Sequence, residues 1–156
     1  MNILFTLCGR AGSKGVKGKN IRDFCGAPLV WYSLAAITLY KKRYLTDADQ
    51  IQVVLNTDSE NLISIVNRIS EMQISIIQRQ DNLSGDVVPK VSVIKDCLYK
   101  SEVKFGCSFD MVIDLDITSP LRTVQDIEAA IEKKKIRDKI DVVYSVTHSR
   151  RNPYFN

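Results

Sequence analysis

Five short apolar runs recur along the chain, and longer stretches of mixed apolar and polar residues separate them. Each run is four to eight residues long and is bounded by polar residues or glycine. Runs of this kind are typical of buried β-strands. The pattern therefore predicts five strands, at residues 3–7, 51–55, 74–77, 109–116 and 142–147.

The stretches between these runs carry apolar residues at spacings of three and four, which place them on one face of an α-helix. The first predicted helix ends near residues 41–43, where three cations suit the negative end of its dipole. Proline in a first turn and Ser/Thr–Glu or Thr–Asp pairs mark the helix starts. The predicted starts are residues 26–28, Thr57 with Glu60, Asp86 with Pro89, and Thr123 with Asp126.

Strand and helix patterns alternate through all 156 residues, and the connections between them are short. This alternation predicts a single α/β domain over residues 1–156, with a mostly parallel sheet flanked by helices and right-handed crossovers. Polar loops follow the strands at residues 8–22, 78–86 and 117–122. Because the carboxyl ends of parallel strands meet at one edge, we expect these three loops to form one site.

The composition is that of an ordinary globular protein, with 45% apolar and 26% charged residues. No run has the length of a membrane span, and the first residues lack the basic region and cleavage site of a signal peptide. The net charge of +4 is concentrated in the first loop, which a local anionic ligand explains. We therefore expect a cytoplasmic location, no nucleic-acid partner and no membrane partner.

The four cysteines are widely separated, and no Cys-x-x-Cys pair occurs. His148 is the only histidine, so a zinc site built from thiolates and imidazoles is not expected. Reduced thiols are the expectation for a cytoplasmic chain. A catalytic pair of one cysteine with His148 stays open, although no spacing supports it. The cysteines are Cys8, Cys25, Cys97 and Cys107.

The loop of residues 8–22 combines glycines with cations directly after the first predicted strand. Free backbone N–H groups and positive charge at a strand end suit the phosphates of a nucleotide. Neither a Walker loop nor the Gly-x-Gly of a dinucleotide fingerprint is present, so a flexible basic surface loop stays open. The glycines are Gly9, Gly12, Gly15 and Gly18, and the cations are Arg10, Lys14, Lys17, Lys19 and Arg22.

The sequence Arg10-Ala-Gly-Ser-Lys-Gly15 followed by Lys19-Asn20 resembles the N-terminal signature of the acylneuraminate (CMP-sialic or CMP-nonulosonic acid) cytidylyltransferases. Similar motifs follow in the same order at residues 79–86, 116–122 and 145–154. The resemblance implies a Rossmann-like nucleotide-diphosphosugar transferase fold. It also implies that a dimerisation segment and a metal-binding strand follow this N-terminal part in a longer, homodimeric enzyme.

The activity implied by the resemblance is nucleotidyl transfer, in which a nine-carbon sugar acid and CTP give the CMP-sugar and pyrophosphate. CTP and the sugar acid are then the partners of the site, and Mg²⁺ is its cofactor. Three cations are expected at the phosphates: Arg10, Lys14 and Lys19. The nucleotide is expected to contact Gly12, Ser13, Gly15, Asn20, Arg79, Ser84 and Gly85. The sugar acid is expected to contact Asp116, Thr118, Ser119 and Arg122.

Asp116 stands where the family carries a glutamine that contacts the sugar acid. A carboxylate cannot donate a hydrogen bond as an amide does, which suggests legionaminic or pseudaminic acid more than sialic acid. Asp114 and Asp116 are two apart in a predicted strand, so both side chains point to one side. This pair is the candidate Mg²⁺ site. The alternative is that the pair binds no metal, and that one aspartate is buried and hydrogen-bonded while the other is exposed.

Other functions also fit the sequence. The 156 residues could form a CTP-binding module that is catalytically incomplete. A related sugar-nucleotide transferase is possible, either a 3-deoxy-octulosonate cytidylyltransferase or a guanylyltransferase for molybdenum cofactor. A basic RNA-binding domain is a further alternative, and it would show a steep dependence of binding on salt.

Overall fold

The computed structural model describes residues 1–12, 15–69, 72–85, 87–136 and 139–148. Its centre is a four-stranded sheet in which every pairing is parallel, which confirms the predicted sheet type. The strands are β1 (Asn2–Gly9), β4 (Gln50–Thr57), β5 (Ser75–Gln78) and β6 (Met111–Asp114). They lie in the order β5-β4-β1-β6.

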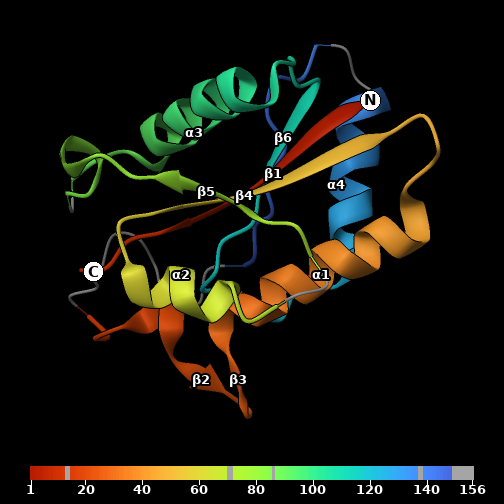
Figure 1. The fold of residues 1–156 in the computed structure, drawn as a ribbon. Coiled ribbons are helices and arrows are strands. Elements are labelled where there is room, and N and C mark those ends of the chain that lie inside the picture. Colours follow the sequence, from red (N-terminus) through yellow and green to blue (C-terminus); the bar gives the residue numbers. More distant parts are fainter. Residues whose placement is uncertain (13–14, 70–71, 86, 137–138, 149–156) are drawn as a thin grey trace.

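Helices cover both faces of this sheet (Figure 1). They are α1 (Leu29–Tyr44), α2 (Glu60–Val66), α3 (Lys90–Phe105) and α4 (Val124–Ile136). α3 lies alone on one face, and α1 and α2 lie on the other with α4 beside α1 (Figure 1). The result is the three-layer α/β arrangement that the sequence predicts.

The alternation of side chains along β1 explains how one strand serves both layers. Phe5 and Leu7 are completely buried in the larger core, with α1, α2 and α4. Leu4, which precedes Phe5 in the strand, is buried on the opposite face against Cys97 of α3. Because β1 is central and both of its faces are covered, its sequence is continuously apolar, as is usual in parallel sheets.

The order of the strands determines where a ligand can reach the sheet. The chain moves from β1 outward to β4 and β5, and then crosses back to place β6 on the other side of β1. The strand order therefore reverses between β1 and β6, and the loops that leave these two neighbouring strands begin at the same edge. Such a switch point is the usual ligand site of an open parallel sheet.

Two of the predicted helix starts differ from the structure. Residues 23–28 form a small hairpin of β2 (Asp23–Phe24) and β3 (Ala27–Pro28), and α1 begins only at Leu29. Cys25 and Gly26 connect these strands with φ angles of 50° and 87°, which is the geometry of a type I′ turn. The residues that were predicted to begin the helix therefore pair as a strand.

The predicted capping box at Thr57 is wrong. Ser59 is the N-cap of α2, and its Oγ accepts a hydrogen bond of 3.3 Å from the backbone N–H of Leu62. Thr57 still belongs to β4, and its Oγ1 accepts from the N–H of Ser59 at 3.0 Å. The strand thus continues two residues beyond the end of its apolar run, and the helix begins correspondingly later.

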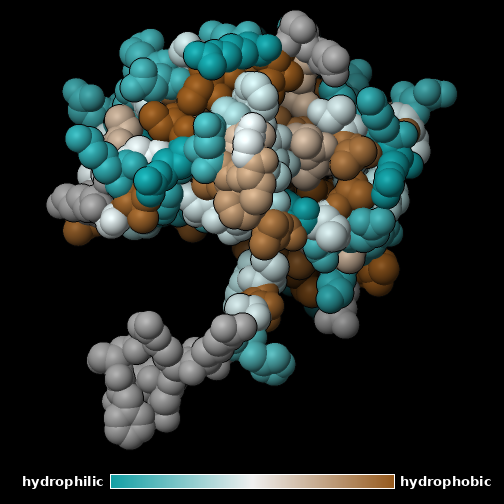
Figure 2. Space-filling view, turned by 90° about the horizontal axis from the view of Figure 1, so that it is seen from below, coloured by the Kyte–Doolittle hydropathy of each residue, from teal (hydrophilic) through white to brown (hydrophobic). Residues whose placement is uncertain are grey.

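The predicted fifth strand at residues 142–147 is also not observed. This segment has no strand pairing in the structure, and Val142, Tyr144 and Val146 are 71–81% exposed. Figure 2 shows hydrophobic residues, in brown, at the surface of the molecule among hydrophilic ones. A strand is stable only when its backbone groups have a pairing partner, and no described strand lies beside this segment.

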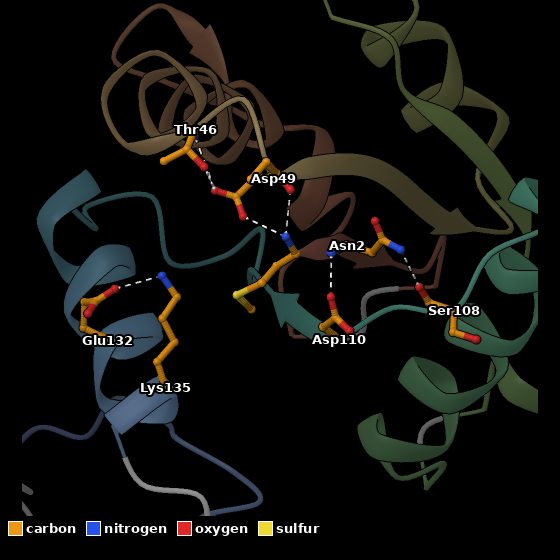
Figure 3. Close-up of polar contacts among 9 residues, drawn as sticks. Asn2, Thr46, Asp49, Ser108, Asp110, Glu132 and Lys135 are labelled. Atoms are coloured by element: carbon orange, nitrogen blue, oxygen red, sulfur yellow. Dashed lines mark hydrogen bonds and ion pairs between the residues drawn. The ribbon is translucent and has the colours of Figure 1, made fainter.

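Polar contacts hold the amino end of β1 between its neighbours (Figure 3). The terminal ammonium of Met1 lies 3.0 Å from Asp49 Oδ1, and Asp49 also accepts from Thr46 Oγ1 at 2.7 Å. On the other side, the N–H of Asn2 donates to Asp110 Oδ2 at 2.8 Å. Hydrogen bonds from Thr46 and from the terminus lower the pKa of Asp49 to about 2.

None of the helices in the described part of the chain combines the length and the apolar character that a membrane crossing requires.

Candidate nucleotide site

The basic loop begins at Gly9, where the backbone of β1 packs tightly against side chains from α2 and from the loop after β6. A Cβ on Gly9 would lie 2.6 Å from Leu62 Cδ2 and 2.9 Å from Ile117 Cδ1, so only glycine fits without displacing two buried side chains. Asn20, which is 9% exposed, donates from Nδ2 to the carbonyl of Arg10 at 3.1 Å. These contacts close the loop at its base, and the described residues further along the loop, 11–12 and 15–17, are exposed.

Two longer-range hydrogen bonds fix the direction of the loop. Asp58, which follows β4, accepts from the backbone N–H of Ala11 at 2.8 Å. Arg10 donates from Nη1 to the carbonyl of Ser84, in the loop after β5, at 3.3 Å. The loops that follow three neighbouring strands therefore meet above the carboxyl edge, as expected for parallel strands.

The other predicted residues of the basic loop lie around this base. Gly12, Gly15 and Lys19 are exposed, and Lys19 is close enough to lower the pKa of Asp116. Ser13 and Lys14 lie outside the described residues, as do Asp86 and the motif beyond residue 148. Lys19 and Arg10 thus occur at the same edge as the acidic pair, while the position of Lys14 stays a prediction.

Arg79 is buried directly beneath the meeting loops, at 6% exposure. Its Nε donates to Asn56 Oδ1 at 2.7 Å and its Nη2 to the Asn56 carbonyl at 3.2 Å. Because the guanidinium can only donate, the amide of Asn56 must present its oxygen to Arg79. Asn56 Nδ2 is then left buried without a partner among the described residues. Ser84 and Gly85 lie in the loop above this pair.

An acidic pair with a lysine between the two side chains ends the neighbouring strand β6. Asp114 accepts from Thr6 Oγ1 at 2.9 Å through Oδ1, and its Oδ2 lies 2.6 Å from Lys90 Nζ. The same Nζ lies 3.8 Å from Asp116 Oδ2. Asp116 Oδ1 in turn accepts from the N–H and the Oγ1 of Thr118, at 3.1 and 3.0 Å.

The electrostatics of this group are those of a mutually stabilised ion cluster. Burial acts against the charge of Lys90, but Asp114 and Asp116 outweigh it and raise the pKa of the ammonium. Burial likewise opposes the charge of Asp116, but Lys90 and the bonds from Thr118 hold the pKa of its carboxyl below the usual value. Lys90 and Asp116 are therefore both charged at neutral pH.

The acidic pair does not fit Mg²⁺ in this arrangement. Three of its four carboxylate oxygens already hold Thr6, Lys90 or Thr118, and the fourth faces the ammonium of Lys90. Mg²⁺ requires oxygen ligands at about 2.0–2.1 Å in near-octahedral geometry. In the described ranges, no group of three or more histidine, cysteine, aspartate or glutamate side chains is arranged to hold a metal.

Arg122 supports the loop after β6 from below. Its Nη1 donates to Ser33 Oγ of α1 at 2.8 Å, and its Nη2 donates to the carbonyl of Asp116. Ser119 is exposed, and its N–H closes the turn on the same carbonyl at 3.2 Å. A surface hollow between α1 and α4 includes Arg122, but its other lining residues lie outside the predicted site.

The cysteines do not supply a nucleophile from the interior. All four are free thiols, and Cys97 is completely buried. Burial raises the pKa of the Cys97 thiol to about 12, and it also raises the pKa of Cys8. Neither is a thiolate at neutral pH, so neither can serve in a cysteine–histidine pair.

Comparison with known proteins identifies the family. A family model described as Cytidylyltransferase matches residues 7–153, nearly the whole chain. The chain belongs to the cytidylyltransferase family. The resemblance carried by residues 10–20 and by the later motifs is thereby confirmed at the family level.

The curated relatives of this cytidylyltransferase chain are longer proteins. It is 36% identical to post-translational flagellin modification protein B of Campylobacter coli and 35% identical to the CMP-N,N′-diacetyllegionaminic acid synthase of Campylobacter jejuni. Each alignment covers 99% of this chain but 61% of the relative, so the chain spans about three fifths of their length. The synthase of the same name from Legionella pneumophila is 29% identical, over 89% of this chain and 56% of the relative.

A solved structure has the same fold. CMP:2-keto-3-deoxy-manno-octonic acid synthetase complexed with CTP matches 90% of this cytidylyltransferase chain and 50% of its own, with a TM-score of 0.64 and 16% identity. At that identity the likeness shows the fold alone. The predicted nucleotide-sugar transferase fold is therefore confirmed.

Two residues of the site were missed in the sequence. Asp58 has the position of a helix-cap residue, and only the structure shows that it holds Ala11, 47 residues away. Lys90 follows Pro89 at the start of α3 and belongs to no recognisable motif. Its place directly after a strand, on the same edge as the basic loop, is a signal that pointed to Asp58.

Replacing Asp58 by alanine should weaken CTP binding by about tenfold, because one hydrogen bond to a charged group is worth about 1.5–3 kcal/mol. The loss should come from a less ordered loop base, with the fold intact. Isothermal titration calorimetry measures the affinity, and Asp58→Asn is the control because it keeps an acceptor oxygen at the same place. Equal weakening by both variants would contradict the role of this hydrogen bond.

Proposed function

We propose that the protein containing this chain activates a nonulosonic acid with CTP, giving the CMP-sugar and pyrophosphate. The observation that carries the proposal is the bond from Arg10 to the Ser84 carbonyl, which joins the basic loop and the Arg79 loop above one sheet edge. One loop would hold the triphosphate and the other the cytosine. Family membership and the 35–36% identical relatives support the same reaction.

The reaction needs charge neutralisation and alignment from the protein. The anomeric hydroxyl attacks the α-phosphorus, the bond to the bridging oxygen of pyrophosphate breaks, and the hydroxyl proton is lost to solvent or base. Arg10, Lys14 and Lys19 would stabilise the charge that grows on the leaving pyrophosphate. Backbone N–H groups between Gly12 and Gly15, with Ser13, would align the phosphates.

The base and the sugar acid would lie on either side of the triphosphate. Arg79, Ser84 and Gly85 would bind the nucleotide, with Asn20 at the base of the loop. Asp116, Thr118, Ser119 and Arg122 would form the sugar-acid side. Asp116 in place of glutamine and the names of the two diacetyllegionaminic acid synthases favour a legionaminic-type substrate.

The remaining predictions concern the whole protein. Mg²⁺ would enter with the phosphates of CTP. A homodimer and a cytoplasmic location stay predictions, and the proposed destination of the sugar is surface polysaccharide. The flagellin modification relative suggests a protein acceptor as an alternative destination for the sugar.

The test separates binding from turnover. This chain should bind CTP with a dissociation constant on the order of micromolar to millimolar, and more tightly than UTP or GTP. A longer protein that contains it should release pyrophosphate with N,N′-diacetyllegionaminic acid and CTP. If only the longer protein reacts, the present chain is the CTP-binding part. If neither binds CTP in magnesium buffer, the proposed function is wrong.

A further inference from the structure

The Asp114–Asp116 pair poses a problem for a site that binds a nucleotide. Two carboxylates at the switch point, beside loops meant for a triphosphate, would repel the ligand unless a cation compensates them. The sequence suggested Mg²⁺ for that purpose. The structure instead has the ammonium of Lys90 at 2.6 Å from one carboxylate and 3.8 Å from the other.

We propose that Lys90 is the built-in cation of this acidic pair, occupying the place that a divalent ion would need and making the sheet edge compatible with an anionic nucleotide. The second part of this statement rests on the proposed function, whereas the first does not. Lys90 is thus a positioning residue, acting through Asp114 and Asp116.

The contacts around the pair support this assignment. Asp114 is fixed from two sides, by Thr6 on β1 and by Lys90, and its side chain is only 16% exposed. Asp116 is tied to its own turn through Thr118 and is 52% exposed on the side chain. Lys90 is the group that faces both carboxylates, and it belongs to the first turn of α3. The pair is therefore held in place by neighbours that do not require a metal.

A cation titration tests the first part without nucleotide. In Mn²⁺ binding followed by electron paramagnetic resonance, the parent chain should show no site at this pair. Lys90→Gln should bind Mn²⁺ at least about tenfold more tightly, because two uncompensated carboxylates attract a divalent ion. The gain should disappear in the Lys90→Gln/Asp114→Asn double variant. Lys95→Gln, on the exposed side of the same helix, is the matched control and should behave like the parent.

A CTP titration in EDTA tests the second part. Lys90→Gln should weaken CTP binding about tenfold, because it leaves one uncompensated negative charge at the edge. The double variant restores the net charge of the parent and should recover most of the affinity. A direct contact of Lys90 with the nucleotide would give no recovery, and that result would overturn charge compensation.

Two further results would overturn the proposal. One is a parent chain that binds Mn²⁺ as tightly as Lys90→Gln and loses it on Asp114→Asn, since the pair would then be a metal site. The other is a folded Lys90→Gln variant, checked by circular dichroism, that gains no Mn²⁺ binding. If the parent ignores CTP altogether, the proposed function fails, and the Mn²⁺ titration still decides the role of Lys90.

Discussion

The Arg10→Ala/Lys14→Ala double variant should bind CTP about 100-fold more weakly than the parent or worse. Each cation is expected to make a charge-assisted contact with phosphate, worth about 1.5–3 kcal/mol, and tenfold in affinity corresponds to about 1.4 kcal/mol. The effect should shrink as salt rises, because exposed charges are screened. Calorimetry at low and moderate ionic strength measures both.

A control variant removes one lysine and one arginine from a part of the chain outside the phosphate loop. Lys42→Ala/Arg43→Ala takes one lysine and one arginine from the last turn of α1, and both side chains are exposed. α1 runs back across the sheet from the carboxyl edge, so both charges lie more than three helical turns from the start of this helix. Arg43 also lines the hollow between α1 and α4 that includes Arg122, which is outside the proposed phosphate loop. This control should change CTP affinity by less than about threefold, as expected for remote screened charges. Parent-like affinity in the Arg10→Ala/Lys14→Ala variant would refute the phosphate loop.

Arg79→Met should destabilise the fold by about 3 kcal/mol, a large part of the 5–15 kcal/mol typical of a domain. The variant removes both hydrogen bonds to Asn56 and leaves a completely buried amide without any partner. Urea denaturation measures the free energy of unfolding. Arg68→Met removes an exposed arginine after α2 and should cost less than about 0.5 kcal/mol.

A double variant separates the structural role of Arg79 from its role in binding. Asn56→Leu/Arg79→Met replaces both polar partners by apolar side chains, and it should recover to within about 1.5 kcal/mol of the parent. If Arg79 binds the cytosine base of CTP, both Arg79→Met and this stable double variant should lose CTP binding. A double variant no more stable than Arg79→Met would contradict the pairing argument, and parent-like CTP affinity would contradict base recognition.

The chemistry of the site was only partly predictable. The basic glycine loop and the Arg79 loop carry their character in consecutive residues, so the sequence suffices to suggest a nucleotide. The pair Asp114 and Asp116 faces one lysine, but β6 ends at Asp114, so the predicted strand geometry does not account for the position of Asp116. The cation beside this pair could not be predicted from the strand pattern, because Lys90 reaches the pair only through the path of α3 across the sheet.

Local patterns determined the elements themselves. Apolar runs predicted the strands of the parallel sheet, and apolar spacings of three and four predicted the helices. Both patterns are local, because the buried face of a strand or helix is set by residues that are close together in the sequence. The same method failed at residues 142–147, where an apolar run pairs with no strand among the described residues. It also missed the hairpin at residues 23–28, whose turn depends on two positive φ angles.

The sequence by itself determined the α/β alternation, the edge at which the loops gather and the cationic character of the first loop. Only the tertiary structure decided that Asp58 holds Ala11 across 47 residues, that Arg10 reaches Ser84 across 74, and that Lys90 stands between two carboxylates. The physical reason is that periodicity reports which face of an element is buried. Contacts between distant segments depend on strand order and helix path, which no local pattern specifies.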